Sequence, residues 1–225
     1  MHRILLALSL ISAPFGAFAQ TAPSAAEVAL YDGLHRAAHV DDVAAIRSLL
    51  AAGADPDQRD AAGRTPAHVA AFASNDSALQ ALAAGGADMN ALDNQVYDVL
   101  TIAAVADDPE MVSLAMKLGN RPDLVTSVYD GTALIAAAHL GHAEVVRRLI
   151  SGGAPLDHVN NLGWTALIEA VILGDGGAAH VEIVRALVEA GADATLSDRD
   201  GVTPLQHAEL RGYDEIVSLL TPFGE

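Results

Sequence analysis

The chain repeats itself at a nearly constant interval, and this period constrains the fold more than any other feature. The threonine in "GTALIAAA" and "WTALIEA" marks one position per unit, and the marked positions lie 33, 33, 34, 33 and 38 residues apart. A glycine before each loop keeps the same register, so chance likeness in an alanine-rich chain is excluded. The marker residues are Asp32, Thr65, Asp98, Thr132, Thr165 and Thr203, and the glycines are Gly53, Gly86, Gly119, Gly153 and Gly191.

Each unit reads as two short helices. Threonine at the marker predicts an N-cap, and Pro66 and Pro204 follow it where a first-turn proline costs no hydrogen bond. An alanine stands five residues after every marker and predicts close helix packing, while "EVVRRLI" has helical spacing of its apolar residues. One such hairpin cannot bury both of its faces, so the units must stack into a single solenoid over residues 27–225.

The repeated motifs resemble those of the ankyrin repeat. "RTPAHVAA", "VTPLQHAE", "LGHAEVV" and "AGADP" are similar to that family's "TPLHxAA" helix, "GHxEIV" link and "GAD" loop. The resemblance implies an all-α ankyrin-repeat solenoid of about six helix-turn-helix units with short β-turn fingers. Units one and three depart from it, with aspartate at the marker. The implied repeats are approximately 27–60, 61–94, 95–128, 129–161, 162–200 and 201–225.

The first residues have the features of a secretory signal peptide. A charged start at His2 and Arg3 precedes the apolar run "ILLALSLISAPFGA" and the small-residue pattern "AFA". We therefore expect residues 1–19 to be removed on export, residues 20–26 to form a linker, and the mature protein to lie in the periplasm of a Gram-negative cell. The chain is also similar to exported bacterial ankyrin proteins that share "YDVLTIAAVADDPEM" and "ILGDGG", which implies a link with oxidative-stress defence.

Composition narrows the classes of partner. The formal net charge is −17, which disfavours nucleic acid and anionic membrane surfaces, because both require basic residues. The chain has no cysteine, so its stability must come from packing without disulfides. We expect a monomer that binds an unidentified protein.

The expected partner surface is the concave face of the array. The resemblance implies that the residues just before each marker, and seven or eight after it, are exposed there. Four of the seven aromatic side chains outside residues 1–19 fall on this stripe, and exposed aromatic residues are typical of binding hot spots. Alternatively, the rings lie flat over neighbouring fingers and only stiffen the array. The predicted partner-binding residues are Tyr31, His39, Arg64, Phe72, Tyr97, His139, Leu140, Trp164 and Ile172.

Other chemistry has weaker support. The "HExxH", "GxSxG" and "GxxxxGK" motifs do not occur, so we predict no catalytic residue, no cofactor and a non-enzymatic function. Metal or small-ligand binding by surface histidines is the alternative. His35 and His68 occupy the histidine position of the ankyrin "TPLH" motif, and this resemblance implies that both bond backbone in the adjoining turn. The acid pairs Asp41–Asp42 and Asp107–Asp108 are expected to cap second helices.

Unit five carries an insertion. Five extra residues lie within "GDGGAAH", residues 174–180, and three glycines there predict a flexible loop. It is either a docking element or a tolerated insertion.

Overall fold

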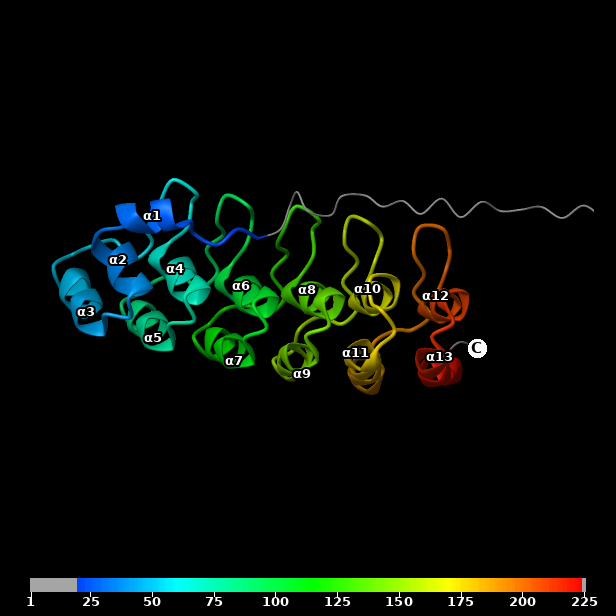
Figure 1. Ribbon diagram of the computed structural model, residues 1–225. Coiled ribbons are helices and arrows are strands. Elements are labelled where there is room, and N and C mark those ends of the chain that lie inside the picture. The colour runs from blue at the N-terminus through cyan, green and yellow to red at the C-terminus, as the bar shows by residue number, and fades with distance from the viewer. Residues whose placement is uncertain (1–19, 224–225) are drawn as a thin grey trace, which may run out of the picture.

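The computed structural model describes residues 20–223 and shows helical hairpins stacked side by side in one row (Figure 1). A short helix, α1 (Ala25–Leu30), precedes the stack, and a 3-10 turn, η2 (Thr221–Phe223), follows it. The inner helices are α2 (Gly33–His39), α4 (Pro66–Phe72), α6 (Val99–Val105), α8 (Ala133–Leu140), α10 (Ala166–Ile172) and α12 (Pro204–Arg211). The outer helices are α3 (Val43–Ala51), α5 (Asp76–Ala84), α7 (Pro109–Lys117), α9 (Ala143–Ser151), α11 (Ala178–Glu189) and α13 (Asp214–Leu220).

Loops project to one side of the stack, where each outer helix is joined to the next inner helix (Figure 1). We call these loops, residues 53–64, 86–97, 119–131, 153–164 and 191–202, fingers one to five. Residues 20–223 contain no strand, only an isolated bridge between Thr126 and Gly131 in finger three. The all-α solenoid predicted from the period is therefore confirmed. No helix within residues 20–223 has the length and apolar character needed to span a membrane.

The small residues of the repeat form the centre of the stack. The alanine five positions after the marker is buried in all six units: Ala37, Ala70, Ala103, Ala137, Ala170 and Ala208. Leu34, Leu100, Leu134 and Leu167 are buried beside them. Each inner helix packs against the next, because alanine lets neighbouring backbones approach while leucine supplies apolar area.

The predicted N-caps are confirmed at three of the four threonine markers; Thr65 makes no such bond from its side chain to the backbone. The hydroxyls of Thr132, Thr165 and Thr203 accept hydrogen bonds from backbone N–H groups three residues on. Asp98 does the same for the Thr101 N–H at 2.8 Å, so the departure in unit three preserves the cap. Asp32 makes no such bond. Among the acid pairs, Asp42 and Asp108 cap α3 and α7 as expected.

Histidines tie successive repeats together, as predicted. His35 Nε2 lies 2.9 Å from the Arg64 carbonyl oxygen, and His68 Nε2 lies 3.0 Å from the Tyr97 carbonyl oxygen. Both carbonyls lie at the end of the next finger. The two rings are buried, so they serve the packing of the stack rather than its surface.

The segment before the first repeat differs from expectation. Helix α1 begins at Ala25, inside the range 20–26 expected as a linker, and Ser24 and Glu27 cap it reciprocally. The predicted signal peptide, residues 1–19, lies outside the described residues.

The insertion is bonded on both sides rather than loose. The Tyr213 hydroxyl donates to the Gly174 carbonyl at 3.0 Å, and His180 Nδ1 lies 3.1 Å from Asp175 Oδ1. Residues Ala178 to His180 extend α11 by one turn. The glycines thus permit a tight entry to a longer helix.

Candidate partner-binding surface

Three of the predicted partner-binding residues are buried, so the expectation that they are exposed is wrong. Tyr31, Arg64 and Tyr97 expose only 8%, 3% and 7% of their surface. Tyr31 is the C-cap of α1 and Arg64 pairs with Glu27 of that helix, which the period of the repeat did not predict. Tyr97 precedes the marker of unit three, and its backbone bonds Asp93 on one side and His68 on the other.

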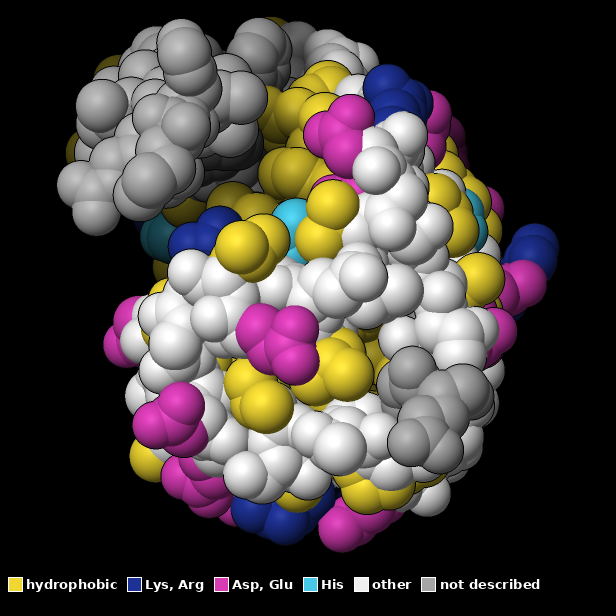
Figure 2. Space-filling view, turned by 90° about the vertical axis from the view of Figure 1, so that its right-hand side faces the viewer, with side chains coloured by type: hydrophobic (Ala, Val, Ile, Leu, Met, Phe, Trp, Pro, Cys, Tyr) yellow, Lys and Arg dark blue, Asp and Glu magenta, His cyan; other side chains and the backbone are white. Residues whose placement is uncertain are grey.

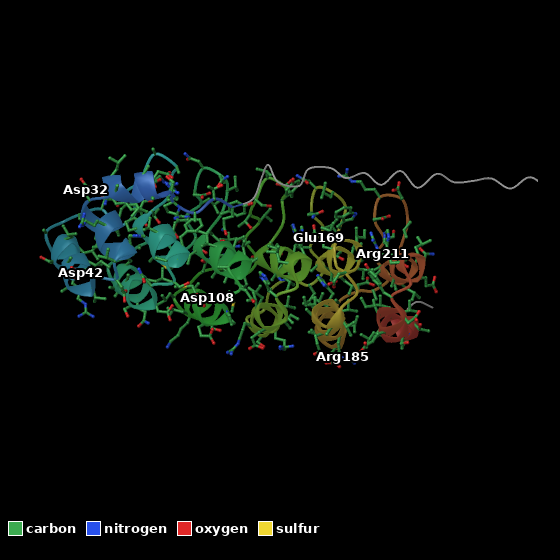
Figure 3. The ribbon with its side chains drawn as sticks, in the orientation of Figure 1. Asp32, Asp42, Asp108, Glu169, Arg185 and Arg211 are labelled. Carbon is green, nitrogen blue, oxygen red and sulfur yellow. The ribbon has the colours of Figure 1, made fainter. Side chains whose placement is uncertain are left out.

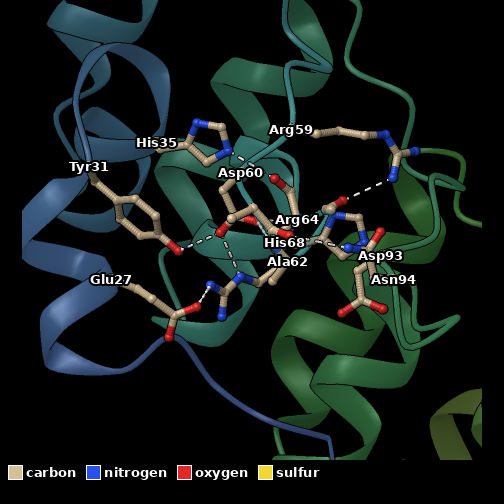
Figure 4. A network of polar contacts seen from close by, with 12 residues as sticks. Glu27, Tyr31, His35, Arg59, Asp60, Ala62, Arg64, His68, Asp93 and Asn94 are labelled. Carbon is tan, nitrogen blue, oxygen red and sulfur yellow. Dashed lines mark hydrogen bonds and ion pairs between the residues drawn. The ribbon is translucent and has the colours of Figure 1, made fainter.

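Arg64 and Tyr31 belong to a polar cluster around Asp60 (Figure 4). The Arg64 guanidinium donates from Nε to Asp60 Oδ2 at 2.7 Å, and it also pairs with Glu27 of α1. The Tyr31 hydroxyl donates to the same Asp60 oxygen at 3.0 Å. The cluster joins α1, the start of α2 and finger one.

The charges in this cluster compensate one another. Burial alone would raise the pKa of Asp60, but hydrogen bonds from Arg64 and Tyr31 outweigh it and lower that pKa. Burial would lower the pKa of Arg64, but its bonds to Asp60 and Glu27 raise it. Burial raises the pKa of the Tyr31 hydroxyl. All three groups therefore act as a structural unit and are not available to a partner.

The other predicted residues keep part of their surface. Leu140 is exposed at 45%, and the His139 side chain at 41%. The side chains of His39, Phe72, Trp164 and Ile172 are half-buried. Phe72 packs against the hydrophobic core.

A pocket of about 300 Å³ lies on the finger side of repeats three to five. It brings together three of the predicted residues, Tyr97, His139 and Leu140. Its other prominent side chains were not predicted: Tyr129, Asn160, Leu162, Glu169 and Leu173. Because inner helices supply one wall and fingers the other, the pocket joins side chains far apart in the sequence.

Glu169 is the most unusual residue of this pocket. It lies on α10, whose other residues are all apolar, and it exposes only 5% of its surface (Figure 3). Its Oε1 accepts a hydrogen bond from Asn160 Nδ2 at 2.7 Å, and its Oε2 lies 3.5 Å from His139 Nδ1. A buried carboxylate on a concave wall is a candidate ligand-recognition group.

A comparison with repeat six explains the Asn160–Glu169 pair. The residues at the same two positions there are Asp198 and His207, joined by a 2.7 Å contact from Nε2 to Oδ2. In both repeats a finger residue bonds a helix residue nine positions later, but in repeat five the acid has moved from the finger to the helix. The sequence signal available for Glu169 was a single acidic residue within the otherwise apolar segment "ALIEAVI".

The surroundings of the pocket are acidic or neutral. None of its lining residues is lysine or arginine. Figure 2 looks along the stack at its C-terminal end, where acidic side chains are scattered among hydrophobic ones. Within residues 20–223, no three His, Asp or Glu side chains are arranged to hold a metal ion.

Comparisons with known proteins agree with this architecture. A family model described as "Ankyrin repeats (3 copies)" matches residues 34–124, 100–198 and 134–224. The ankyrin repeat protein YahD of Escherichia coli (strain K12) is 34% identical over 84% of this chain and 94% of its own length. The crystal structure of an ankyrin repeat domain from Acinetobacter baumannii AYE is 44% identical, with a TM-score of 0.80 over 85% of this chain and 97% of that one. Glycerophosphocholine phosphodiesterase gde1 of Schizosaccharomyces pombe shares 34% identity over 38% of this chain, but only 8% of the enzyme is covered.

Proposed function

The chain belongs to the ankyrin-repeat family, and we propose that it is a non-enzymatic scaffold that binds a partner protein over the pocket of repeats three to five. Ankyrin repeats generally mediate protein–protein interactions. The single observation that carries the proposal is this pocket, where exposed Leu140 lies at the rim and Glu169 is buried inside. An apolar rim around a few convergent polar groups is typical of recognition sites.

The proposed contact surface is smaller than the sequence predicted. We call it the binding patch; it comprises the predicted residues that keep exposed surface, together with the pocket. Repeats four and five contribute most of it. Its members from the prediction are His39, Phe72, His139, Leu140, Trp164 and Ile172.

We also propose that the protein works after export to the periplasm. The charged start, apolar run and "AFA" pattern of residues 1–19 support this. The resemblance to exported bacterial ankyrin proteins supports a role in oxidative-stress defence. Sequencing the amino terminus of the protein from a periplasmic fraction tests export: a start at Gln20 is expected, and an intact Met1 in the cytoplasm contradicts it.

Photo-crosslinking tests the scaffold function. A photoreactive amino acid at Leu140 is expected to capture a defined protein from a periplasmic extract, whereas the same group at Gln80 on outer helix α5 is not. Trp164→Ala is expected to weaken binding of the captured protein by about 2 kcal/mol, a typical hot-spot loss, with little change in thermal stability. A partner captured only from Gln80, or bound equally by Trp164→Ala, contradicts the proposal.

Metal or small-ligand binding by surface histidines has less support. Ring nitrogens of His142 and His158 lie 2.9 Å and 2.7 Å from the backbone carbonyl oxygens of Ala104 in helix α6 and Asp130 in finger three. Ring nitrogens of His35 and His68 bond carbonyl oxygens of the following repeat. These nitrogens are thus engaged in packing. Titration of chelator-treated protein with zinc, followed by calorimetry, tests this alternative, which a stoichiometric tight site would favour.

A further inference from the structure

The carboxylate of Glu169 has no close cationic partner. Its Oε1 is bonded to the neutral amide of Asn160, and only His139 approaches Oε2, at 3.5 Å. That distance is longer than a normal hydrogen bond of this type. Removing a carboxylate from water is costly unless an opposite charge or hydrogen bonds replace the lost solvent.

Asp60 and Asp198, which are partly buried, differ in this respect, whereas the buried Asp98 also has only amide donors, but both of its oxygens are bonded, one by the Thr101 N–H and one by Asn120 Nδ2. Asp60 is bonded by the Arg64 guanidinium at 2.7 Å, and Asp198 by the His207 ring at 2.7 Å. In repeat five the equivalent link uses an amide as donor to Oε1 of Glu169, a residue that lines the pocket, and Oε2 lies 3.5 Å from His139 Nδ1. The chain thus presents a desolvated negative group to whatever enters.

The walls of the pocket suit a long basic side chain. Leu140, Leu162 and Leu173 offer apolar surface, and Tyr97 and Tyr129 offer aromatic surface. Lysine and arginine combine an apolar stem with a charged head, and aromatic faces attract cations. The formal charge of −17 also favours approach by a basic surface.

We propose that this pocket receives a lysine side chain of the partner protein, with its ammonium group at Glu169 Oε2 and its stem against Leu140 and Leu173. Lysine fits better than arginine because Asn160 already occupies Oε1, which leaves a single oxygen for a compact charge rather than two for a guanidinium fork. The inference rests on the proposed function, since it identifies what the partner inserts.

The test uses the purified protein and three small probes. Nα-acetyl-lysine methylamide, its norleucine analogue and its arginine analogue are titrated while the methyl resonances of Leu140 and Leu173 are followed by NMR. The lysine probe is expected to bind in the millimolar range, at least tenfold more tightly than norleucine, and more tightly than arginine. Equal binding of lysine and norleucine overturns the inference, and preference for arginine overturns the choice of lysine.

Two variants locate the site. Glu169→Gln keeps the carbonyl that Asn160 bonds but removes the charge, and it is expected to weaken the lysine probe at least tenfold. Glu182→Gln makes the same charge change on outer helix α11 and is the control, since that side chain is 52% exposed. Unchanged lysine affinity in a folded Glu169→Gln protein refutes the assignment.

A second pair does not alter the buried residue. Leu140→Lys places a competing ammonium at the rim and is expected to lower affinity for the lysine probe at least fivefold, whereas Leu210→Lys, at a position 80% exposed on α12, leaves it unchanged. Equal affinities of these two variants contradict the inference. Crosslinking at Leu140 tests the scaffold function separately. If a partner is captured but the probes bind without selectivity, the scaffold function is supported and only the proposal of a lysine in the pocket is refuted.

Discussion

Buried His68 makes the stability of the stack depend on pH. Its Nδ1 accepts a hydrogen bond from the Thr65 backbone N–H at 3.1 Å, and its Nε2 therefore carries the proton donated to the Tyr97 carbonyl. Protonation would remove the lone pair with which Nδ1 accepts the Thr65 N–H and leave the Thr65 hydroxyl, 2.8 Å away, as the acceptor of the new N–H. Burial lowers the pKa of His68 below its ordinary value of 6.5, although the charges of Asp93 and Asp98 act in the opposite direction.

The sign and size of the effect follow from proton linkage. Below pH 6.5 the unfolded chain binds a proton at this ring that the folded chain does not, so stability falls as the pH falls toward the native pKa. The contribution of His68 to the free energy of unfolding therefore decreases between pH 7 and pH 5, by up to about 1.4 kcal/mol for each unit by which burial lowers the pKa.

The comparison that isolates this effect is His68→Gln. Repeat six has glutamine at the same position, where Gln206 Oε1 accepts the Thr203 N–H at 2.9 Å, so the capping arrangement is retained. The substitution removes the bond to the Tyr97 carbonyl and costs about 1 kcal/mol at pH 7. Because glutamine does not titrate, the stability gap between wild type and variant is expected to shrink or reverse by pH 5.

Urea unfolding at pH 7, 6 and 5 measures that gap. Val69→Ala is the control, because Val69 is the next residue on α4, is fully buried, and cannot titrate. Its gap to wild type should remain constant with pH. If the His68→Gln gap is equally constant, the reasoning about the buried ring is refuted.

Three further substitutions test other features of the stack. Arg64→Leu is expected to lower the free energy of unfolding by about 3 kcal/mol in urea titrations, because it leaves Asp60 buried without its cation, whereas Arg121→Leu at an exposed ion pair should have no measurable effect. Val96 has a φ of 65°, which is strained for a β-branched residue, so Val96→Asn should raise the free energy of unfolding by about 1 kcal/mol; a loss would show that the side chain is needed at finger two. A Cβ on Gly174 would meet the Ala170 carbonyl oxygen, so calorimetry of Gly174→Ala should show a loss of about 2 kcal/mol, and an unchanged melting temperature would contradict the tight entry to α11.

The period of the sequence predicted whatever the repeats share. Inner helices and N-caps recur at fixed offsets from the marker, so one well-formed unit identifies the others. The backbone bonds of His35 and His68 were implied by the resemblance to the ankyrin motif. The burial of Tyr31 and Arg64 did not follow, because it depends on α1, which lies outside the period. The exposure of the residue before the marker depends on the segment that packs beside it. Tyr97 is buried, whereas Trp164 is half-buried.

Glu169 was missed for a related reason. Its significance lies in a difference between repeats, where the acid and its partner exchange places relative to Asp198 and His207. A repeat pattern describes positions that agree and gives no weight to one that disagrees. Side chains from three repeats make the pocket, and only the stacked arrangement brings them together.

The place of α1 has a consequence for how such an array can lengthen. This helix lies on the finger side of α2, where a preceding unit would supply its own loop, and it is fastened there by Glu27 and Arg64 (Figures 1 and 4). A duplicated unit inserted ahead of α2 would have to displace α1, and Arg64 would then lose its ion pair with Glu27. Growth of the protein by duplication is thus directed to the interior or the opposite end of the row.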